Sequence, residues 1–218
     1  MRSIKSMEEK YLLPSLELVE AVFTAHSDAE EGKLVRSLVE EIRSKRFYLP
    51  ELELVMVDEN DEIIGYVNFA RFHLDGKYED ELLLLSPVAV KTALQRQHIS
   101  RELIEYGFEK AKTLGYKAVI VEGNPMNYHS RGFVTSAPFG ITAHESVGLP
   151  APECLMVKEL VPGALDGRNW MYIPSTAADC CEDTAAVEAF DSTFPPKEKK
   201  WMPSQEEFYI YSHSSVVR

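Results

Sequence analysis

The spacing of hydrophobic positions predicts two amphipathic helices near the start of the chain, over residues 14–26 and 30–46. In both segments apolar residues recur every three or four positions and charged residues fill the other side, as in a helix with one buried face. Pro14 suits the first turn of a helix, where no intrahelical N–H bond is lost. The apolar positions are Leu16, Val19, Val22 and Phe23, then Leu34, Leu38, Val39 and Ile42.

The spacing then changes to a period of two, which is typical of β-strands. Leu52, Leu54 and Met56 alternate with other residues, the polar run 58–61 makes a turn, and 63–72 returns as a second strand. This part of the chain therefore predicts a hairpin. Residues 2–7 are a short candidate for a first edge strand.

The centre of the chain reads as strand, loop, helix and strand. Residues 82–90 are a buried strand, 91–97 a short loop, and 117–122 a second strand after an amphipathic helix. A tight polar turn into a helix leaves backbone N–H groups without partners, and the helix dipole adds partial positive charge there. We therefore expect an anion site, suited to a pyrophosphate, at Gln95 to Ser100.

After Phe133 the chain is rich in loops, with a further strand predicted over 153–160. A short apolar strand over 170–173 and a short helix over 184–190 follow. This order of helices and strands predicts a mixed α/β fold around one central sheet.

Composition narrows the class of protein. The 218 residues are 45% hydrophobic, enough for one domain or one domain with an appendage. No apolar run has transmembrane length and the first ten residues lack the core of a signal peptide, so we expect a cytoplasmic protein. Cys154, Cys180 and Cys181 form no CxxC motif, which favours reduced thiols and gives no sign of structural zinc.

The charge is uneven along the chain. A formal net charge of −12 disfavours nucleic acid and anionic membranes as partners. However, residues 82–101 contain no Asp or Glu. The same segment contains three cations, Lys91, Arg96 and Arg101. This basic turn in an acidic protein favours an anion ligand, and chance clustering on a solvated loop is the alternative.

The order of elements and the central motif resemble the GNAT superfamily of acyl-CoA-dependent N-acyltransferases, in particular bacterial predicted N-acetyltransferases with a C-terminal extension. The family's phosphate loop follows Gln/Arg-x-x-Gly-x-Gly/Ala, and residues 95–100 (QRQHIS) fall on it in register. Residues 86–90 resemble the family's splayed fourth strand, 111–118 the helix end and fifth strand, and 123–133 the segment that carries the tyrosine acid.

The resemblance implies a GNAT-like fold, with a mixed, mostly antiparallel central sheet that is splayed at strand 4 and flanked by helices. It implies an acetyltransferase domain over 1–160 and a C-terminal extension over 161–218. The sequence departs from the motif at His98 and Ser100, where the family has glycine and glycine or alanine. Glycine lets the backbone approach a pyrophosphate closely, so His98 either keeps a helical backbone with its ring in solvent or blocks the phosphates. We expect cofactor binding to be retained.

Acetyl-CoA is the co-substrate that the resemblance implies. Tyr128 would protonate the departing thiolate and a backbone N–H near Val88 would polarise the thioester carbonyl. Structural alternatives are packing at a turn for Tyr128 and an Asx turn before Pro125 for Asn124. The cofactor-binding residues implied are Val88, Ala89, Val90, Gln95, Arg96, Gln97, His98, Ile99, Ser100, Arg101 and Asn124.

The sequence offers several candidates for the general base. Leu84 occupies the position at which some members carry a strand-borne glutamate, so the base lies elsewhere or is a water chain. Glu122 is the first candidate, because it closes a central strand and strand ends in such sheets face the ligand crevice. The other candidates are Glu81, Glu53 and His73.

The expected function is transfer of an acetyl group from acetyl-CoA directly to a small amine or peptide acceptor, with a homodimer as a candidate assembly. The acceptor regions offer acidic and aromatic residues, and the basic run 197–200 reads as a solvated surface. Two alternatives are a non-catalytic acyl-CoA sensor and an interaction protein that has lost cofactor binding. The residues offered to an acceptor are Glu30, Glu31, Trp170, Trp201 and Tyr209.

Overall fold

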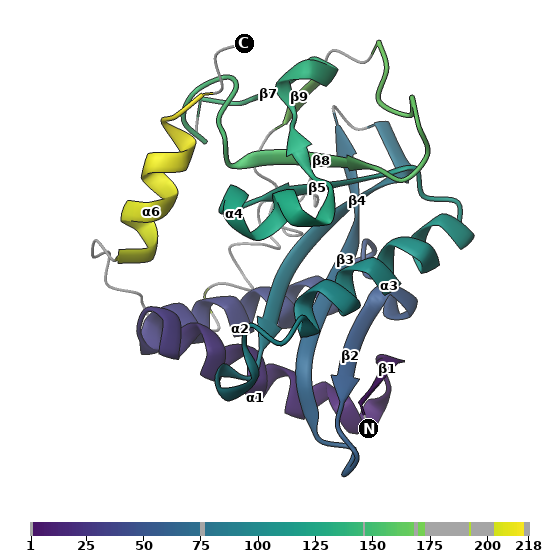
Figure 1. Ribbon diagram of the computed structural model, residues 1–218, viewed down its shortest axis with the longest axis vertical. Coiled ribbons are helices and arrows are strands. Elements are labelled where there is room, and N and C mark those ends of the chain that lie inside the picture. The colour runs from purple at the N-terminus through teal and green to yellow at the C-terminus, as the bar shows by residue number, and fades with distance from the viewer. Residues whose placement is uncertain are drawn as a thin grey trace. The chain divides into compact units, whose positions relative to one another are not determined.

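A seven-stranded sheet with the strand order β1-β2-β3-β4-β5-β8-β6 dominates the computed structural model (Figure 1). The structure describes residues 2–74, 77–145, 147–167, 170–172, 192 and 203–215. Strands β7 and β9 form a separate two-stranded sheet. In chain order the strands and α-helices are β1 (Ser3–Ser6), α1 (Glu9–His26), α2 (Ala29–Ser44), β2 (Glu53–Val57), β3 (Ile63–Leu74), β4 (Lys77–Val90), α3 (Ile99–Thr113), β5 (Ala118–Glu122), α4 (Pro125–Tyr128), β6 (Val134–Thr135), β7 (Ile141–Ala143), β8 (Leu155–Glu159), β9 (Trp170–Tyr172) and α6 (Pro203–Ser212).

The strand pairing confirms the predicted mixed, mostly antiparallel sheet. Strands β1 with β2, β2 with β3, β5 with β8 and β6 with β8 are antiparallel, and β4 with β5 is parallel. The β4–β5 pairs run from Leu82↔Ala118 to Leu84↔Ile120 and end there, although β4 continues to Val90 and β5 to Glu122. The last residues of β4 therefore have no pair in β5, as the resemblance implied for strand 4.

The chain forms two compact units, each assembled from segments that are far apart in sequence. The first contains 1–70 and 85–110, and the second contains 71–84, 111–175 and 200–218. Strands β3 and β4 each contribute residues to both units. The division into 1–160 and 161–218 stays a prediction.

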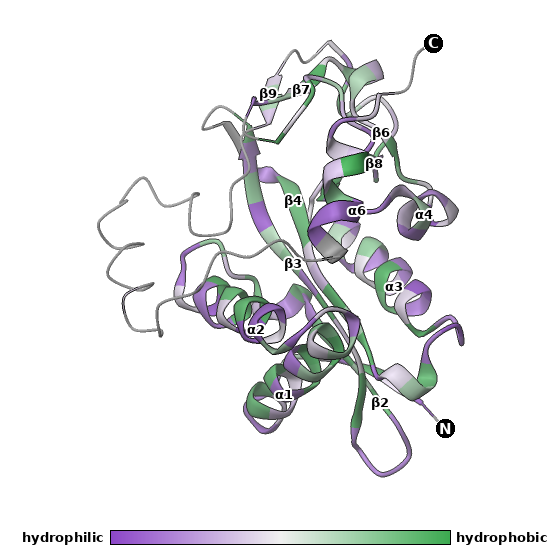
Figure 2. Ribbon diagram, turned by 90° about the vertical axis from the view of Figure 1, so that its left-hand side faces the viewer, coloured by the Kyte–Doolittle hydropathy of each residue, from purple (hydrophilic) through white to green (hydrophobic). Residues whose placement is uncertain are grey.

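In the first unit, alternate residues of β2 and β3 face different helices. Val55, Val57 and Tyr66 pack in one cluster with Tyr11, Val19 and Val39 of α1 and α2. The opposite face of β3 carries α3, and Figure 2 shows α1 and α2 on one side of the strands and α3 on the other. Because both faces of these strands are covered, Val55 and Val57 are buried as well as Leu54 and Met56.

Gly65 of β3 determines how closely α3 approaches the strand. A Cβ added at Gly65 would lie 2.6 Å from Ile99 Cγ2 and 2.9 Å from Leu103 Cδ1. Both of these side chains are buried, and Ile99 is the first residue of α3. The missing side chain at position 65 therefore lets the start of α3 rest directly on the strand.

In the second unit, the C-terminal helix is attached to a loop by its backbone. The N–H groups of Leu149, Glu153 and Cys154 donate to the carbonyls of Ser212, Ser214 and Tyr211, at 2.9, 2.9 and 3.3 Å. Views in Figures 1 and 2 agree that α6 lies beside α4. The C-terminal segment is therefore an integral part of this unit.

Several predicted boundaries were wrong. Helix α1 begins at Glu9, so Pro14 lies in its second turn, where its missing N–H leaves the carbonyl of the exposed Lys10 without an intrahelical donor. The region after Phe133 contains β6 and β7 as well as loops. Helix α6 was not predicted, because its apolar residues do not recur on one face. The helix proposed for 184–190 and the basic run 197–200 lie outside the described residues.

Candidate functional site

The loop between β4 and α3 has an alternating backbone conformation. Arg96 and His98 have φ of 62° and 64°, in the left-handed region, and they flank Gln97, whose φ is not positive. Alternation of handedness turns successive N–H groups toward a common point, and such concave turns bind anions. The loop also leads into the N-terminus of a 15-residue helix, so the dipole of α3 acts in the same direction.

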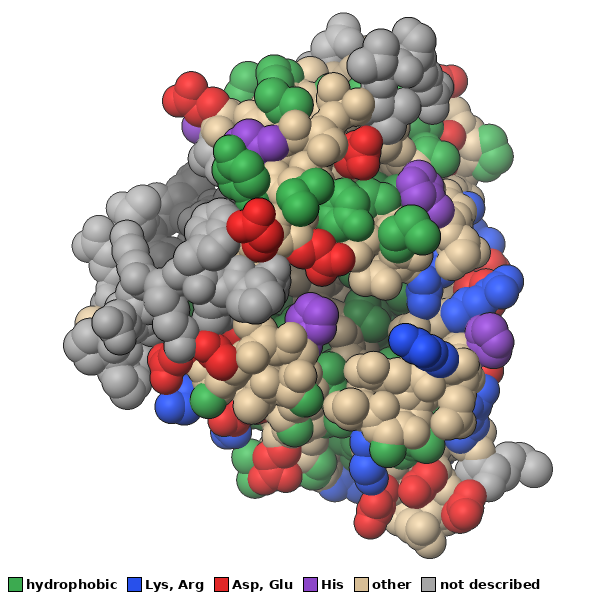
Figure 3. Space-filling model, turned by 60° about the vertical axis from the view of Figure 1, so that its left-hand side comes forward, with side chains coloured by type: hydrophobic (Ala, Val, Ile, Leu, Met, Phe, Trp, Pro, Cys, Tyr) green, Lys and Arg blue, Asp and Glu red, His purple; other side chains and the backbone are tan. Residues whose placement is uncertain are grey.

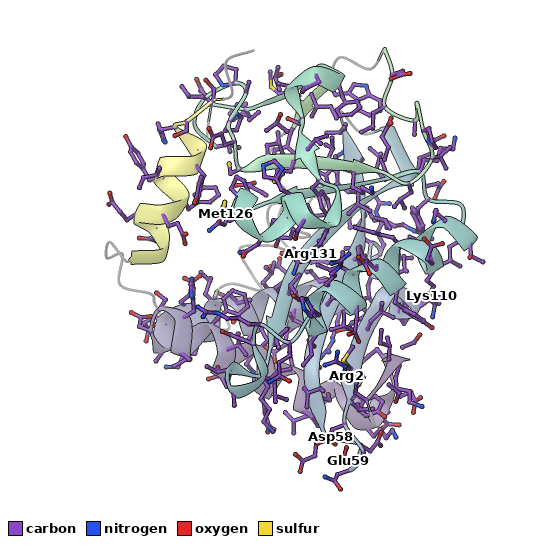
Figure 4. All side chains as sticks on the ribbon, viewed as in Figure 1. Arg2, Asp58, Glu59, Lys110, Met126 and Arg131 are labelled. Atoms are coloured by element: carbon purple, nitrogen blue, oxygen red, sulfur yellow. The ribbon has the colours of Figure 1, made fainter. Side chains whose placement is uncertain are left out.

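Contacts within the first unit hold this loop in place. The Arg2 guanidinium donates to the Gln97 carbonyl at 3.2 Å and also pairs with Glu102 (Figure 4). The Glu102 N–H donates to the His98 carbonyl at 3.0 Å, which is the first turn of α3. The side chain of Ile99, at the end of the loop, is buried in the core, whereas residues 95–98 are exposed to solvent. The loop is therefore exposed and held in place by its contacts.

His98 adopts a left-handed backbone conformation, which glycine tolerates best. A right-handed helical φ, the expectation under which the N–H groups would converge, is not what the structure shows. The left-handed region is strained for a side chain other than glycine, at roughly 1–2 kcal/mol. The imidazole is exposed. The backbone thus keeps the glycine geometry although the side chain has changed.

The three cations of the basic turn differ in their partners. Lys91 lies 3.7 Å from Glu62, and Arg101 lies 2.7 Å from Glu105. Arg96 has no ion-pair partner within the described ranges, and its side chain is exposed. Arg96 is therefore the cation most available to a bound anion.

The predicted edge residues of β4 lie mostly with their side chains in the core. Ala89 and Val90 are buried, whereas Val88 is half-buried, so any cofactor contact here would involve the backbone. The Asn68 side-chain amide donates to the Ser86 carbonyl at 3.1 Å, just before these residues. Asn68 therefore satisfies a β4 carbonyl in the stretch that has no β5 partner.

Glu122 lies at the carboxyl end of β5, in the second unit. Its Oε2 accepts a hydrogen bond from the Tyr172 hydroxyl at 2.7 Å. Burial raises the pKa of the Glu122 carboxyl, and the hydrogen bond from Tyr172 partly opposes that rise. A carboxylate with a raised pKa, partly shielded from water, has the properties of a general base.

Tyr128 ends the short helix α4 and packs on the end of β5. A Cβ on Gly123 would lie 3.0 Å from Tyr128 Cε2, so the glycine makes room for the ring, whose other neighbour is Phe133 at 5.6 Å between centroids. Burial raises the pKa of the Tyr128 hydroxyl, which keeps its proton, and Arg131 lowers it in part. In the portion of the chain that is described, this hydroxyl makes no hydrogen bond, so its proton is available to a ligand.

Both polar atoms of the Asn124 side chain are hydrogen-bonded within the protein. Its Oδ1 accepts from the Met126 N–H at 2.9 Å. This bond caps α4 and forms the Asx turn that is the structural alternative for Asn124. Its Nδ2 donates to Glu207 of α6 at 2.7 Å. A contact with the pantetheine arm would have to replace the bond to Glu207.

The other candidate bases have structural partners. Glu53 is fully buried, and its carboxylate accepts from Arg43 at 2.7 Å, from Tyr66 at 2.6 Å and from Tyr48 at 2.5 Å. Glu81 pairs with Lys117 at 2.8 Å, and His73 stacks on Phe72. The carboxylate of Glu53 is therefore fully used inside the core, and Glu122 stays the first candidate for the base.

The residues expected near an acceptor belong to different elements of the two units. Glu30 and Glu31 form the first turn of α2, Trp170 is buried, and Tyr209 stacks on His213 at 3.9 Å. Trp201 lies outside the described residues. Met126 of α4 and Ile210 of α6 are 77% and 52% exposed, and Figure 3 shows hydrophobic and acidic side chains next to each other on one face.

Tyr172, Asn68 and Glu207 were missed by sequence reasoning. Tyr172 and Glu207 lie 50 and 83 positions from the residues that they contact, and no local motif marks them. Asn68 lies inside a strand, and the alternating pattern predicts only on which face of the sheet such a residue lies. A signal for these residues exists only in the folded chain.

Comparison with known proteins agrees with this architecture. The family model described as Acetyltransferase (GNAT) family matches residues 19–137, more than half of the chain. The uncharacterized N-acetyltransferase YhbS of Escherichia coli (strain K12) is 32% identical over 111 residues, 51% of this chain and 62% of that protein. This chain therefore spans less than two thirds of the length of that relative.

Solved structures share the fold. YhbS from Escherichia coli in complex with CoA superposes with a TM-score of 0.70 at 24% identity, covering 82% of this chain and 92% of that one. A GNAT family acetyltransferase from Brucella melitensis in complex with acetyl-CoA gives 0.57 at 20% identity, covering 74% and 90%.

The fold, the loop and the family match define a GNAT acetyltransferase domain. The chain belongs to the acetyltransferase (GNAT) family. Of the helices that the structure describes, none is long and apolar enough to cross a membrane.

Proposed function

We propose that this protein is an N-acetyltransferase that takes acetyl-CoA as co-substrate and transfers the acetyl group directly to an amine. The observation that carries the proposal is the left-handed backbone of Arg96 and His98 in a loop that matches the family's phosphate motif. Relatives of the same fold were solved with CoA or acetyl-CoA bound, which supports the same ligand here.

In this proposal the loop 95–101 binds the pyrophosphate through backbone N–H groups and the Arg96 guanidinium. The edge of β4 at residues 88–90 contributes backbone groups to the pantetheine arm, and the N–H near Val88 polarises the thioester carbonyl. The polarised carbonyl carbon becomes a better target for an amine because negative charge on its oxygen is stabilised.

Glu122 and Tyr128 carry the two proton transfers. Glu122 removes a proton from the acceptor ammonium, and the free amine attacks the carbonyl carbon to form the C–N bond. The C–S bond then breaks, and Tyr128 donates its proton to the departing CoA thiolate. Solvent takes up the second proton of the attacking nitrogen, restores the proton to Tyr128 and removes the one on Glu122, so each cycle yields an acetylated amine and free CoA.

The acceptor is an amine, with small amines, polyamines and peptide N-termini as the classes to test. The acidic chain suits a cationic acceptor. A cytoplasmic location and a homodimer are parts of the same proposal. The acyl-CoA sensor differs from it in lacking turnover, and the interaction protein in lacking cofactor binding.

A thiol-release assay over a panel of amines, with acetyl-CoA present, tests the proposed reaction. The wild-type chain should release CoA with at least one amine. Tyr128→Phe should lower turnover by roughly 10²–10⁴-fold, as expected for loss of a general acid, and should leave binding of acetyl-CoA unchanged. Binding without turnover for every amine would favour the sensor.

A further inference from the structure

A tyrosine from the C-terminal part of the chain contacts the candidate base. Tyr172 donates its hydroxyl proton to Glu122 Oε2 at 2.7 Å, and it lies beyond the residues 19–137 that match the family model. We propose that Tyr172 is a positioning residue that orients the Glu122 carboxylate and keeps it ionised for proton removal from the acceptor. This inference rests on the proposed function, in which Glu122 is the base.

The backbone fixes both partners of this hydrogen bond. Tyr172 pairs with Ala143 in the two-stranded sheet, and its carbonyl accepts from the His144 N–H at 2.8 Å. Its ring is 2% exposed and packs against Phe72 at 5.6 Å between centroids. Glu122 pairs with Leu155 of β8. The hydroxyl is thus held at one place relative to the carboxylate.

The hydrogen bond leaves one carboxylate oxygen available. Glu122 Oε1 has no hydrogen bond within the described residues, so it can accept the proton of an ammonium while Oε2 stays on Tyr172. A hydroxyl that donates to a carboxylate stabilises the ionised form, which burial alone would disfavour.

The other titratable group that interacts with Glu122 in the described structure is Cys154. This thiol is buried, and burial together with the Glu122 charge raises its pKa to about 12, so it stays protonated and adds no charge. Tyr172 is therefore the group that favours the carboxylate form of Glu122.

Tyr172→Phe tests the proposal, because it removes the hydroxyl and keeps the ring on Phe72. The pKa of Glu122 would be measured in the full chain by NMR titration of ¹³C-labelled glutamate carboxyls, with the resonance assigned through Glu122→Gln. We expect the pKa of Glu122 to rise by about one pH unit or more, since a hydrogen bond to a charged group has that strength. The rise in acetyl-transfer rate with pH should move upward by the same amount.

Tyr66→Phe is the matched control. It also removes a buried tyrosine hydroxyl from a glutamate, at 2.6 Å from Glu53, but in the other unit. It should destabilise the fold without moving the pKa of Glu122 or the pH–rate profile. A general effect of losing a buried hydroxyl would move the profile in both variants and would contradict the proposal.

The outcomes separate the inference from the proposed function. An unchanged pKa of Glu122 in Tyr172→Phe overturns the inference even if the wild type acetylates amines. A raised pKa with an unchanged pH–rate profile overturns it too, because Glu122 would then not be the base. Absence of turnover in the wild type removes the proposed function, whereas the NMR titration still decides whether Tyr172 holds Glu122 ionised.

Discussion

His98 has the backbone of a glycine and the side chain of a histidine. Its φ of 64° lies in the region where a Cβ causes strain, and such strain persists only where the surroundings impose it. Here the Arg2 contact to Gln97 on one side and the buried Ile99 on the other impose it. Strain of this kind is found at ligand-binding turns, which supports the proposed role of the loop.

His98→Gly should therefore stabilise the protein. Relief of the left-handed strain is worth roughly 1–2 kcal/mol, and the larger unfolded-state entropy of glycine takes back about 0.4–1 kcal/mol. The expected net gain is small and positive in urea unfolding. Gln97→Gly, in the same loop at a negative φ, is the control and should destabilise. A loss of stability in His98→Gly would show that the imidazole makes a contribution larger than the strain.

Arg96→Gln should weaken acetyl-CoA binding by about tenfold, because a hydrogen bond to a charged group is worth roughly 1.5–3 kcal/mol when buried and less at an exposed site. Arg101→Gln should have a smaller effect, since Arg101 already pairs with Glu105. Titration calorimetry on both variants measures the difference. Equal losses would mean that the loop attracts the anion only through its overall charge.

Among the elements, the position of α3 on β3 determines the position of the loop between β4 and α3. Ile99 is both the residue next to His98 and the residue that touches Gly65. Any displacement of the start of α3 would therefore move the N–H groups of the loop. The loop, the start of α3 and strand β3 are therefore packed together.

Gly65→Ala tests this dependence. A Cβ 2.6 Å from Ile99 Cγ2 requires the Ile99 side chain or the start of α3 to shift, and such overpacking costs roughly 1–3 kcal/mol. We expect lower stability in urea unfolding and weaker acetyl-CoA binding. The double variant Gly65→Ala with Ile99→Ala makes space again and should recover part of the lost affinity. Normal binding in Gly65→Ala alone would show that the loop position is independent of β3.

Sequence periodicity predicted the elements that bury at least one apolar face and failed for α6, whose apolar residues are exposed. The hairpin, the two first helices and the strand–loop–helix–strand centre follow from apolar spacing, because each buries one face or two. Helix α6 escaped prediction, since Phe208, Tyr209 and Ile210 are consecutive and exposed. The role of Glu53 was equally hidden, because its partners Arg43, Tyr48 and Tyr66 come from three separate segments.

In the whole molecule, one segment of an acidic chain contains no acidic residue. The net charge of −12 repels phosphates in general, yet residues 82–101 contain no acid, and Arg96 has no ion-pair partner among the residues that the structure describes. The family match ends at residue 137, but the partner of Glu122 comes from Tyr172 and the partner of Asn124 from Glu207. The C-terminal segment therefore supplies contacts to the residues that are proposed to carry the chemistry.

The most direct test of the account is titration calorimetry of acetyl-CoA into the full chain. We expect saturable binding to one site per chain, together with a rise in melting temperature, because a ligand that binds the native state stabilises it. Absence of both heat and thermal stabilisation at millimolar acetyl-CoA would contradict it.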